Sequence, residues 1–456
     1  MPAAANHMEP DLLQEARTLI VGLGATGLSC ARFLVQRGVE VAVIDSRQHP
    51  PALANMQQEL PHVALFTGGF DAGVFRRAER ILVSPGVSLK EPLLVEARQR
   101  GVEVIGDIEL FARSALAPVV AITGSNGKST VTTLLGAMAQ QAGMNVRVGG
   151  NLGTPALDLI REQEPDLYVL ELSSFQLETV QSLHCRAATV LNISPDHLDR
   201  YDSLAAYARA KQRIFSGAEI QVVNRDDVAA AALASDEIPA VGFGLGEPVP
   251  AIQEFGLLKM PDGVWIAKGS ECWMPASAVR IPGRHNLANA LAALALGEVL
   301  GFPREAMLQV LKEFQGLPHR TQWVAETGGV RWFNDSKATN PGATCAAIQG
   351  FDGPLVLLAG GQGKGADFSG LAASLDARVK VVVLLGEAAD EIDAALQGKV
   401  ATQRASDMFD AVRQAAALAV PGDTVLLSPA CASFDMFRDY RQRGEIFIQA
   451  VKELHR

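Results

Sequence analysis

Three α/β domains in a row are the architecture that this sequence predicts, and three observations predict it. The chain has 456 residues, which is too long for a single hydrophobic core. Short apolar runs alternate with amphipathic helical stretches in three successive regions, a pattern typical of parallel sheets covered by helices on both faces. The 42 glycines suit the many tight strand-to-helix turns of such a fold.

The first predicted domain, residues 1–106, is Rossmann-like. Its apolar runs are RTLIV, VEVAVID, RILVSPG and VEVIGD, with helical stretches such as LSCARFLVQRG between them. Gly22, Gly24 and Gly27 follow the first run at G-x-G-x-x-G spacing, and the second run ends at Asp45. Such a turn holds a pyrophosphate at a helix N-terminus. The motif alone leaves the ligand open between NAD and other nucleotides, because mononucleotide-binding folds use the same turn and some glycines serve only close packing.

The second predicted domain, residues 107–316, is P-loop ATPase-like and opens with AITGSNGKST between a strand and a helix. Ile122 stands where the G-x-x-x-x-G-K-[ST] pattern has its first glycine, so the loop is a shortened form. Backbone N–H groups would cradle phosphate oxygens, Lys128 would face the β and γ phosphates, and Ser129 would offer its hydroxyl to Mg²⁺. The alternative is an ordinary glycine turn with a solvated Lys128. The expected ATP-binding residues of the loop are Gly124, Ser125, Asn126, Gly127, Lys128, Ser129 and Thr130.

Short strand-like pieces from QVVNRDD to IPGRHN and the alanine-rich helix HNLANALAALALGEVL complete the central domain. The third predicted domain, residues 317–456, is again Rossmann-like, with the segments VRWFNDSKATNP, PLVLLAGGQGKGADF, KVVVLLGE and DTVLLSPACASFD. In parallel sheets of this kind the strand ends meet at one edge, and ligands bind there.

Composition restricts the compartment and the partners. The net charge is -10 and no extended Lys/Arg block offsets it, which argues against a nucleic-acid surface. The five cysteines are scattered without C-x-x-C spacing, which favours reduced thiols over disulfides or a zinc site. No signal peptide is apparent, and no run approaches the roughly 20 apolar residues of a membrane span. We therefore expect a soluble, cytoplasmic protein without membrane partners, and we leave residues 1–7 out of the fold prediction.

Candidate metal-binding residues follow the phosphate loop. Glu171 ends an apolar run, so it is predicted to lie at a strand tip and to offer the hard oxygen that Mg²⁺ prefers. Asn192, Asp196 and His197 follow a second run. His197 is less typical for Mg²⁺ and is equally consistent with a loop histidine satisfied by its neighbours. Lys211 lies in a helical stretch, where a lysine normally faces solvent.

Taken together, these segments resemble the Mur ligases, the ATP-dependent amide-forming enzymes of peptidoglycan precursor synthesis. The resemblance covers nearly the whole chain, because the matching segments follow one another in the order that the family shows. These segments are TGSNGKST, ELSSFQLE, NISPDHLDR, GRHNLANALAA, GLPHR, NDSKATNP and SPACASFDMFRDYRQRG. The resemblance is closest to the branch that joins D-glutamate to UDP-N-acetylmuramoyl-L-alanine, with SPACASFD and GGQGKGADF as the discriminating pieces. The D-N-P-R motif of the branch that adds a diamino acid is absent.

The resemblance implies a reaction and its cofactors. ATP would phosphorylate the substrate carboxylate, and the amine of D-glutamate would attack the resulting acyl phosphate. Mg²⁺ and protein cations would offset the repulsion between the anions and stabilise the transferring phosphoryl group. The implied catalytic residues are Lys128, which would bind the γ-phosphate, His197 and Lys211. Two Mg²⁺ sites are implied, one on Ser129 and Glu171 and one on His197 with Lys211. Lys211 matches a lysine that family members carry as a carbamate, a group that can bind Mg²⁺ where an ammonium cannot.

The resemblance also assigns binding residues in all three domains. Beyond the loop, ATP would meet Asn289, Arg320 and Asp335, and closure of the third domain would complete that site. The expected contacts of the UDP substrate, rather than NAD, are Thr26, Asp45, Ser46, Arg47, Ser84, Gly86 and Asn151. The expected contacts of D-glutamate are Lys337, Thr339, Lys364, Ser433 and Tyr440. The alternatives are that Arg47 is an ordinary surface arginine and that NDSK and SPACAS are only capping and turn segments.

Three other functions are compatible with parts of the sequence. Folate polyglutamate ligases share the central and third domains but lack a GLGATG-type first domain. A nicotinamide-dependent oxidoreductase would bind NAD and consume no ATP. A nonenzymatic nucleotide sensor is disfavoured by the expected gathering of Glu171, His197 and Asp335 at loop edges. Nothing in the sequence demands an oligomer, so a monomer is expected.

Overall fold

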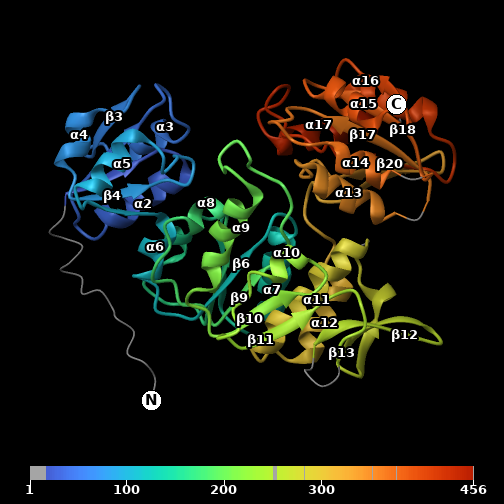
Figure 1. Cartoon of the computed structure of the whole chain (residues 1–456), viewed down its shortest axis with the longest axis horizontal. Coiled ribbons are helices and arrows are strands. Elements are labelled where there is room, and N and C mark those ends of the chain that lie inside the picture. The colour runs from blue at the N-terminus through green and yellow to red at the C-terminus, as the bar shows by residue number, and fades with distance from the viewer. Residues whose placement is uncertain (1–16, 250–253, 282, 352, 376, 455–456) are drawn as a thin grey trace.

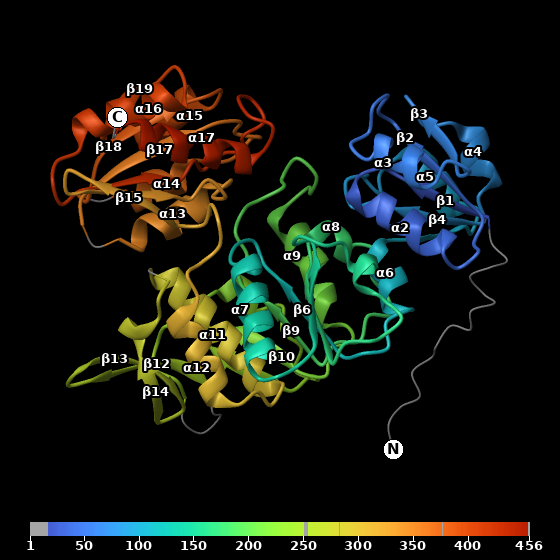
Figure 2. The same ribbon diagram turned by 180° about the vertical axis from the view of Figure 1, so that it is seen from behind.

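The structure is a computed structural model in which three β-sheets follow one another along the chain. It describes residues 17–249, 254–281, 283–351, 353–375 and 377–454. In Figure 1 the first and third units lie at opposite ends of the central one, and Figure 2 shows the same arrangement from behind. The predicted class of three α/β units is confirmed, whereas the prediction for residues 1–16 lies outside the described chain.

The first unit is an all-parallel five-stranded sheet with helices. Its elements are β1 (Thr18–Val21), α2 (Ala25–Val35), β2 (Val41–Asp45), α3 (Leu53–Glu59), β3 (Ala64–Thr67), α4 (Ala72–Arg77), β4 (Arg80–Val83), α5 (Pro92–Gln99) and β5 (Glu103–Ile105). The strand order is β3-β2-β1-β4-β5. Because these strands are parallel, the loops after β1, β2 and β4 meet at one edge of the sheet.

The central unit has a mixed nine-stranded sheet. Its elements are α6 (Asp107–Ala112), β6 (Val119–Thr123), α7 (Lys128–Gln141), β7 (Val146–Gly150), η1 (Ala156–Leu159), β8 (Leu167–Glu171), α8 (Ser174–Leu177), β9 (Ala187–Val190), α9 (Leu204–Gln212), η2 (Arg213–Phe215), β10 (Gln221–Asn224), α10 (Val228–Ala231), β11 (Ala240–Phe243), β12 (Phe255–Met260), β13 (Gly263–Lys268), β14 (Glu271–Pro275), η4 (Ala276–Ala278), α11 (Arg284–Val299) and α12 (Arg304–Glu313). The strand order is β14-β13-β12-β11-β10-β9-β6-β8-β7, antiparallel only among β12, β13 and β14 of the described strands. The fully buried strands β6, β8 and β9 are rigid supports for the loops that follow them.

The third unit has a six-stranded sheet. Its elements are β15 (Gln322–Thr327), β16 (Val330–Asn334), α13 (Pro341–Gln349), β17 (Leu355–Gly360), α14 (Ser369–Ser374), β18 (Val379–Leu385), α15 (Ala389–Leu396), β19 (Ala401–Arg404), α16 (Met408–Leu418), β20 (Thr424–Leu427) and α17 (Tyr440–Glu453). The strand order is β15-β16-β20-β17-β18-β19, and β15 pairs antiparallel with β16. Sequence reasoning did not single out the edge strands β3, β15 and β19, because each is partly exposed and lacks the long buried apolar run of a central strand.

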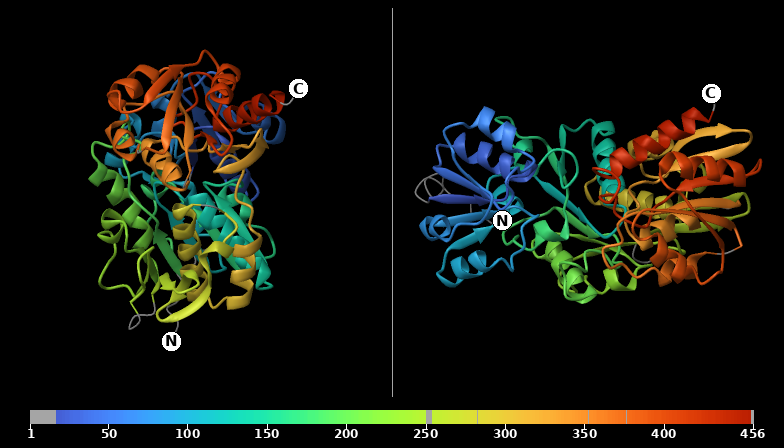
Figure 3. Two further views of the ribbon diagram at one scale, coloured as in Figure 1. Left: turned by 90° about the vertical axis from the view of Figure 1, so that its right-hand side faces the viewer. Right: turned by 90° about the horizontal axis from the view of Figure 1, so that it is seen from above.

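The first and central units share one hydrophobic cluster. It joins Leu23 and Phe33 of the first unit to Tyr168 and Leu170 of β8, and α6 packs against α2 as well as α8. The third unit meets the central one where α13 packs against α11. Seen from above, the three units form a row (Figure 3). No helix in the described ranges is long and apolar enough to cross a membrane.

Candidate active site

The phosphate loop joins the end of β6 to the first turn of α7. Gly124 and Gly127 have φ angles of 152° and 82°, which residues with side chains rarely adopt. A Cβ atom on Gly127 would lie 2.4 Å from Oδ1 of Asn289. The backbone angle therefore favours glycine at position 127, and the side chain of Asn289 lies against the loop at this point.

Asn192 and Ser194, which follow β9, fix this loop from the neighbouring strand end. The backbone N–H of Asn126 donates to Oδ1 of Asn192 at 2.7 Å, and Nδ2 of Asn192 donates back to the Asn126 carbonyl at 3.0 Å. Oγ of Ser125 donates to the Ser194 carbonyl at 3.0 Å. Sequence reasoning named Asn192 but gave it no role; its place directly after the next apolar run was the available signal.

Lys128, the first residue of α7, turns its side chain back onto the loop. Its Nζ donates to the carbonyl oxygens of Gly124 and Ser125, both at 2.9 Å. Burial lowers the pKa of Lys128, while the carboxylates of Glu171 and Asp196 act in the opposite direction. A phosphate oxygen is a stronger acceptor than a carbonyl. The ammonium therefore lies where a nucleotide phosphate in the loop could attract it.

Glu171 ends β8 and is buried, and its two carboxylate oxygens differ. Oε1 accepts a hydrogen bond of 2.7 Å from Nδ2 of Asn151, whereas Oε2 is buried and has no hydrogen-bond partner among the described residues. Burial raises the pKa of Glu171, but the charge of Lys128, the nearby hydroxyl of Ser129 and the hydrogen bond from Asn151 outweigh burial and hold this pKa below its usual value. A buried, ionised oxygen without a donor fits a divalent cation.

Lys211 projects from α9 to the same loop and is only 1% exposed, so the solvent-facing alternative is wrong. Its Nζ donates to the Gly124 carbonyl at 2.9 Å and to Oγ1 of Thr123 at 3.3 Å. Burial, and next the charge of Lys128, lower the pKa of Lys211 well below its usual value. A buried amine with a lowered pKa is more often neutral and nucleophilic.

His197 lies near Lys211 in the loop after β9, with a φ angle of 56°. Its ring packs edge-on against Phe175 at 4.7 Å and lies 6.3 Å from the ring of Tyr207. Within the part of the chain that the structure describes, no group of three or more His, Cys, Asp or Glu side chains is arranged to hold a metal ion. A Mg²⁺ ion at this loop would therefore take further ligands from phosphate and water, as Mg²⁺ commonly does.

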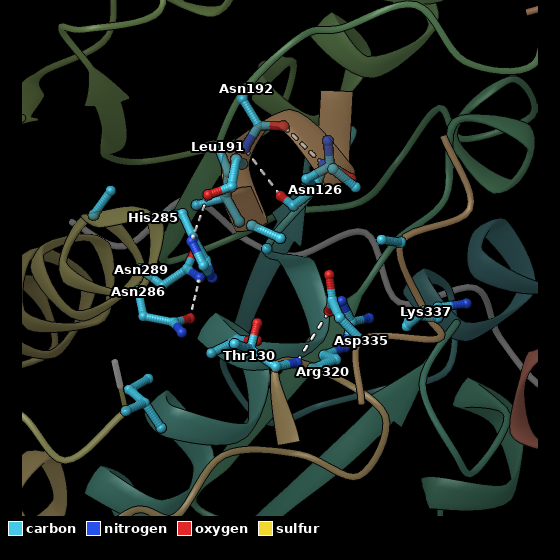
Figure 4. A pocket seen from close by; sticks show the side chains of 18 of the residues that line it. Asn126, Thr130, Leu191, Asn192, His285, Asn286, Asn289, Arg320, Asp335 and Lys337 are labelled. Carbon is cyan, nitrogen blue, oxygen red and sulfur yellow. Dashed lines mark hydrogen bonds between the residues drawn. The ribbon is translucent and has the colours of Figure 1, made fainter. Parts of the chain in front are cut away.

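A cavity of about 310 Å³ lies between the central and third units, beside the loop. Figure 4 shows side chains of α11 on one side and side chains of the third unit on the other. The labelled lining residues are Asn126, Thr130, Leu191, Asn192, His285, Asn286, Asn289, Arg320, Asp335 and Lys337. The structure thus gathers Asn289, Arg320 and Asp335, which lie far apart in the sequence, around one cavity.

Arg320 of the third unit reaches across to the loop. Its Nη2 donates to Oγ of Ser129 at 2.7 Å. Asp335, directly after β16, accepts hydrogen bonds from the backbone N–H of Thr321 at 3.0 Å and from the hydroxyl of Ser428 at 2.9 Å. Burial raises the pKa of Asp335 to about 7. The third unit therefore already contacts the phosphate loop in the structure as it stands.

The residues expected to bind D-glutamate form two groups on the third unit. Nζ of Lys337 lies 4.0 Å from the ring centre of Tyr440, and burial lowers the pKa of Lys337 to about 8. Lys364 is exposed, and its Nζ lies 4.9 Å from the ring centre of Phe434, the neighbour of the buried Ser433. Both groups thus pair a lysine with an aromatic ring.

Arg443 of α17, which sequence reasoning missed, joins these two groups. It is 1% exposed and donates to the carbonyl of Ser336 at 2.8 Å and to that of Ala432 at 3.2 Å. One guanidinium therefore fixes the segment that carries Thr339 to the segment that carries Ser433. The motif RDYRQRG contains this arginine, but sequence alone does not distinguish a buried arginine from an exposed one.

Several residues predicted to contact the UDP substrate also shape the first glycine turn. Asp45 is 2% exposed and accepts hydrogen bonds from the backbone N–H of Leu23 and from Nη2 of Arg47, both at 2.7 Å. Oγ of Ser84 donates to the Gly22 carbonyl at 2.8 Å. These contacts give Asp45, Arg47 and Ser84 a role within the turn, which the sequence did not indicate.

The remaining predicted contacts of the UDP substrate are in different places. Thr26 is half-buried in the first turn of α2, a helix that begins without a side-chain cap and so leaves N–H groups for an anion. Ser46 and Gly86 are exposed at the same edge of the sheet. Asn151 lies beside Glu171 in the central unit, as its hydrogen bond shows.

Two α/β units that meet at a phosphate loop, with a third carrying a glycine turn, define a nucleotide-dependent enzyme, and comparison with known families specifies the class. Three family models match in order: Mur ligase MurD-like, N-terminal domain over residues 16–106; Mur ligase middle domain over 122–297; and Mur ligase, glutamate ligase domain over 319–431. The chain belongs to the Mur ligase family.

Within this family the chain is similar to enzymes named UDP-N-acetylmuramoylalanine–D-glutamate ligase. That of Nitrosococcus oceani is 55% identical over 441 residues, which cover 96% of this chain and 97% of the relative. That of Pseudomonas aeruginosa is 52% identical, covering 96% of this chain and 98% of the relative. That of Methylococcus capsulatus is 51% identical, covering 96% and 95%.

Solved structures share the fold at low identity. A pseudomurein peptide ligase type C from Methanothermus fervidus superimposes with a TM-score of 0.60 at 18% identity, covering 96% of this chain and all of the other. The UDP-N-acetylmuramate-alanine ligase of Thermotoga maritima gives a TM-score of 0.61 at 18% identity, with the same coverage. These likenesses support the three-domain architecture alone.

Proposed function

We propose that this chain is an ATP-dependent ligase that joins the amine of D-glutamate to the carboxylate of UDP-N-acetylmuramoyl-L-alanine through an acyl phosphate. The observation that carries the proposal is the near full-length identity of 51–55% to relatives named for this reaction. The cavity beside the phosphate loop supports it, because an acyl phosphate needs ATP close to a second substrate. By this proposal the protein is a cytoplasmic monomer that acts in peptidoglycan precursor synthesis.

In this proposal ATP occupies the cavity between the central and third units. Lys128 and the backbone N–H groups of the loop hold its phosphates, and Arg320 adds a second cation from the third unit. Ser129 and Glu171 hold one Mg²⁺, which would withdraw charge from the phosphoryl group as it transfers. The unpartnered Oε2 of Glu171 supports that assignment.

Lys211 is proposed to carry a carbamate and to hold a second Mg²⁺ with His197. A carbamate forms when a neutral amine attacks CO₂, and the lowered pKa of Lys211 favours the neutral amine. The resulting carbamate would carry a negative charge and could bind Mg²⁺, which the lysine side chain itself cannot do. Nuclear magnetic resonance with ¹³C-labelled bicarbonate tests this directly: a carbamate signal is expected in the wild-type chain and must be missing in Lys211→Arg.

D-Glutamate is proposed to bind the third unit, with Tyr440 near its side chain. The residues proposed to bind its carboxylates are Lys337, Thr339, Lys364 and Ser433. Arg443 would then act indirectly, because it fixes the two segments that carry these residues. The UDP part is proposed to bind at the glycine turn of the first unit. The residues proposed to contact the UDP substrate are Thr26, Asp45, Ser46, Arg47, Ser84, Gly86 and, from the central unit, Asn151.

The test is phosphate release from ATP by the purified chain with Mg²⁺ and UDP-N-acetylmuramoyl-L-alanine. D-Glutamate, L-glutamate, meso-diaminopimelate and no amino acid are compared. Release that needs D-glutamate, with a new UDP-linked dipeptide seen by mass spectrometry, supports the proposal. No release under any condition, together with NAD binding, would reject it.

A further inference from the structure

Arg200 lies at the junction between the first and central units. It follows His197 in the loop after β9, and its backbone N–H donates to the His197 carbonyl at 3.0 Å. Its guanidinium leaves this loop and enters the first unit, where Nη1 donates to the Pro85 carbonyl at 2.6 Å and Nη2 to the Val87 carbonyl at 3.2 Å. One side chain thus binds the backbone of another unit at two points.

The same guanidinium is anchored to the central unit. Nη2 also donates to Oε2 of Glu178 at 2.9 Å, and the guanidinium carbon lies 4.1 Å from the ring centre of Phe175. The side chains of Arg200 and Glu178 are 13% and 16% exposed, so water screens this ion pair less than a surface pair. A planar fork with five donors holds a carboxylate and two carbonyls in one fixed geometry, whereas a lysine ammonium is a point charge on a flexible stem.

The groups that Arg200 fixes lie next to both halves of the proposed substrate site. On one side, Pro85 and Val87 flank Gly86 and follow Ser84, whose hydroxyl supports the first glycine turn. On the other side, Phe175 packs edge-on against the ring of His197. A change at Arg200 therefore acts on the segment proposed to meet the UDP part and on the ring beside the proposed second metal site.

We propose that Arg200 is a positioning residue, which sets the distance and orientation between the UDP-binding edge of the first unit and the reaction centre of the central unit. This inference rests on the proposed function, because it assumes one substrate that spans both units. It predicts that Arg200 affects the apparent affinity for the UDP substrate. The apparent affinity for ATP should not change, because the proposed ATP site lies between the central and third units.

The kinetic test compares Arg200→Ala and Arg200→Lys with Lys90→Ala. Lys90 forms an ion pair with Asp202 across the same junction, but the two side chains are 67% and 84% exposed. An exposed pair contributes little, so Lys90→Ala is the matched control. Arg200→Ala is expected to raise KM for the UDP substrate by at least about tenfold and to leave KM for ATP within about twofold. Arg200→Lys is expected to be intermediate, and Lys90→Ala to be unchanged within about twofold.

A purely structural role for Arg200 would give a different result. Equal rises in KM for ATP and for the UDP substrate, or no change in either, would overturn the inference. If Arg200→Ala does not fold, Glu178→Gln replaces it, because this change removes the charge that anchors the guanidinium to the central unit. It is expected to raise KM for the UDP substrate selectively, by a smaller factor.

A second measurement needs no ligase activity. Spin labels introduced as unnatural amino acids at the exposed positions Arg98 and Arg209 report the distance between the first and central units in the full chain. We expect a broader distance distribution in Arg200→Ala and a distribution like the wild type in Lys90→Ala. An unchanged distribution in Arg200→Ala would overturn the inference. Broadening in Arg200→Ala, together with a wild-type chain that forms no amide, would keep the role of Arg200 and reject the proposed function.

Discussion

Arg320 of the third unit donates a hydrogen bond of 2.7 Å to Oγ of Ser129 in the phosphate loop. The two residues are 191 positions apart in sequence, so only the packing of the third unit against the central one brings them together. Ser129 also lies close enough to the carboxylate of Glu171, the candidate metal ligand, to lower its pKa. This contact joins the third unit to the residues expected to hold Mg²⁺ and phosphate.

Arg320→Lys is therefore expected to lower kcat for ATP-dependent amide formation by on the order of 100-fold, because a lysine keeps the charge but loses the forked geometry that suits a phosphate. Steady-state kinetics with ATP varied checks this. Arg331→Lys, in the third unit away from the cavity, is the matched control and should change kcat little. A kcat of Arg320→Lys within twofold of the wild type would contradict the placement of Arg320 at the phosphates.

Gly127→Ala should weaken ATP binding without unfolding the chain. The added Cβ would lie 2.4 Å from Oδ1 of Asn289, and the φ angle of 82° is strained for alanine. We expect a stability loss of about 1–3 kcal/mol, seen in urea unfolding, and a much larger loss in ATP affinity, seen by calorimetry. Gly143→Ala tests backbone strain alone, because Gly143 has a φ angle of 84° but, in the described part of the chain, no contact within 4 Å of the added Cβ. Equal ATP affinity in both variants would argue against contact between the loop and the nucleotide.

Asp335 should make the stability of the protein depend on pH. Its pKa is about 7 in the folded chain and near 3.8 when unfolded, so between these values the unfolded chain loses a proton that the folded chain keeps. The contribution of Asp335 to the free energy of unfolding is therefore fully present below about pH 4 and is lost as pH rises to about 7. Above about pH 7 this contribution no longer changes with pH. Asp335→Asn is expected to stabilise the chain relative to the wild type by on the order of 2–3 kcal/mol more at pH 8 than at pH 5. Urea unfolding at both pH values checks this, and an equal difference at the two would contradict the raised pKa.

Lys337 should make the binding of D-glutamate depend on pH in the proposed reaction. Burial lowers the pKa of Lys337 to about 8, so its ammonium loses charge as pH rises through that value. KM for D-glutamate is expected to rise above about pH 8 and to rise at a higher pH in Lys337→Arg, whose charge persists. The measurement is KM for D-glutamate as a function of pH in the wild type and in Lys337→Arg. The same pH dependence in both would contradict the placement of Lys337 at a carboxylate of D-glutamate.

The sequence by itself determined the strands and turns that carry the chemistry. The runs before Gly22 and Gly124 are short and apolar except for one threonine each, and the glycines that follow them have backbone angles that favour glycine. Local sequence was therefore enough to predict both turns. Glu171 could be placed for the same reason, since a residue that ends a buried strand must lie at its tip.

The tertiary structure alone decided which side chains are buried and which meet. Lys211 and Arg443 each lie on a helix, and only the packing of that helix shows that their charged groups are enclosed. Asp45 could be placed at a strand tip, yet its use in holding the first glycine turn depends on contacts with Leu23 and Arg47. Arg200 gains its two acceptors only because the first unit packs against the central one. Sequence pattern reports on neighbours along the chain, whereas burial and long-range hydrogen bonds depend on how whole units pack.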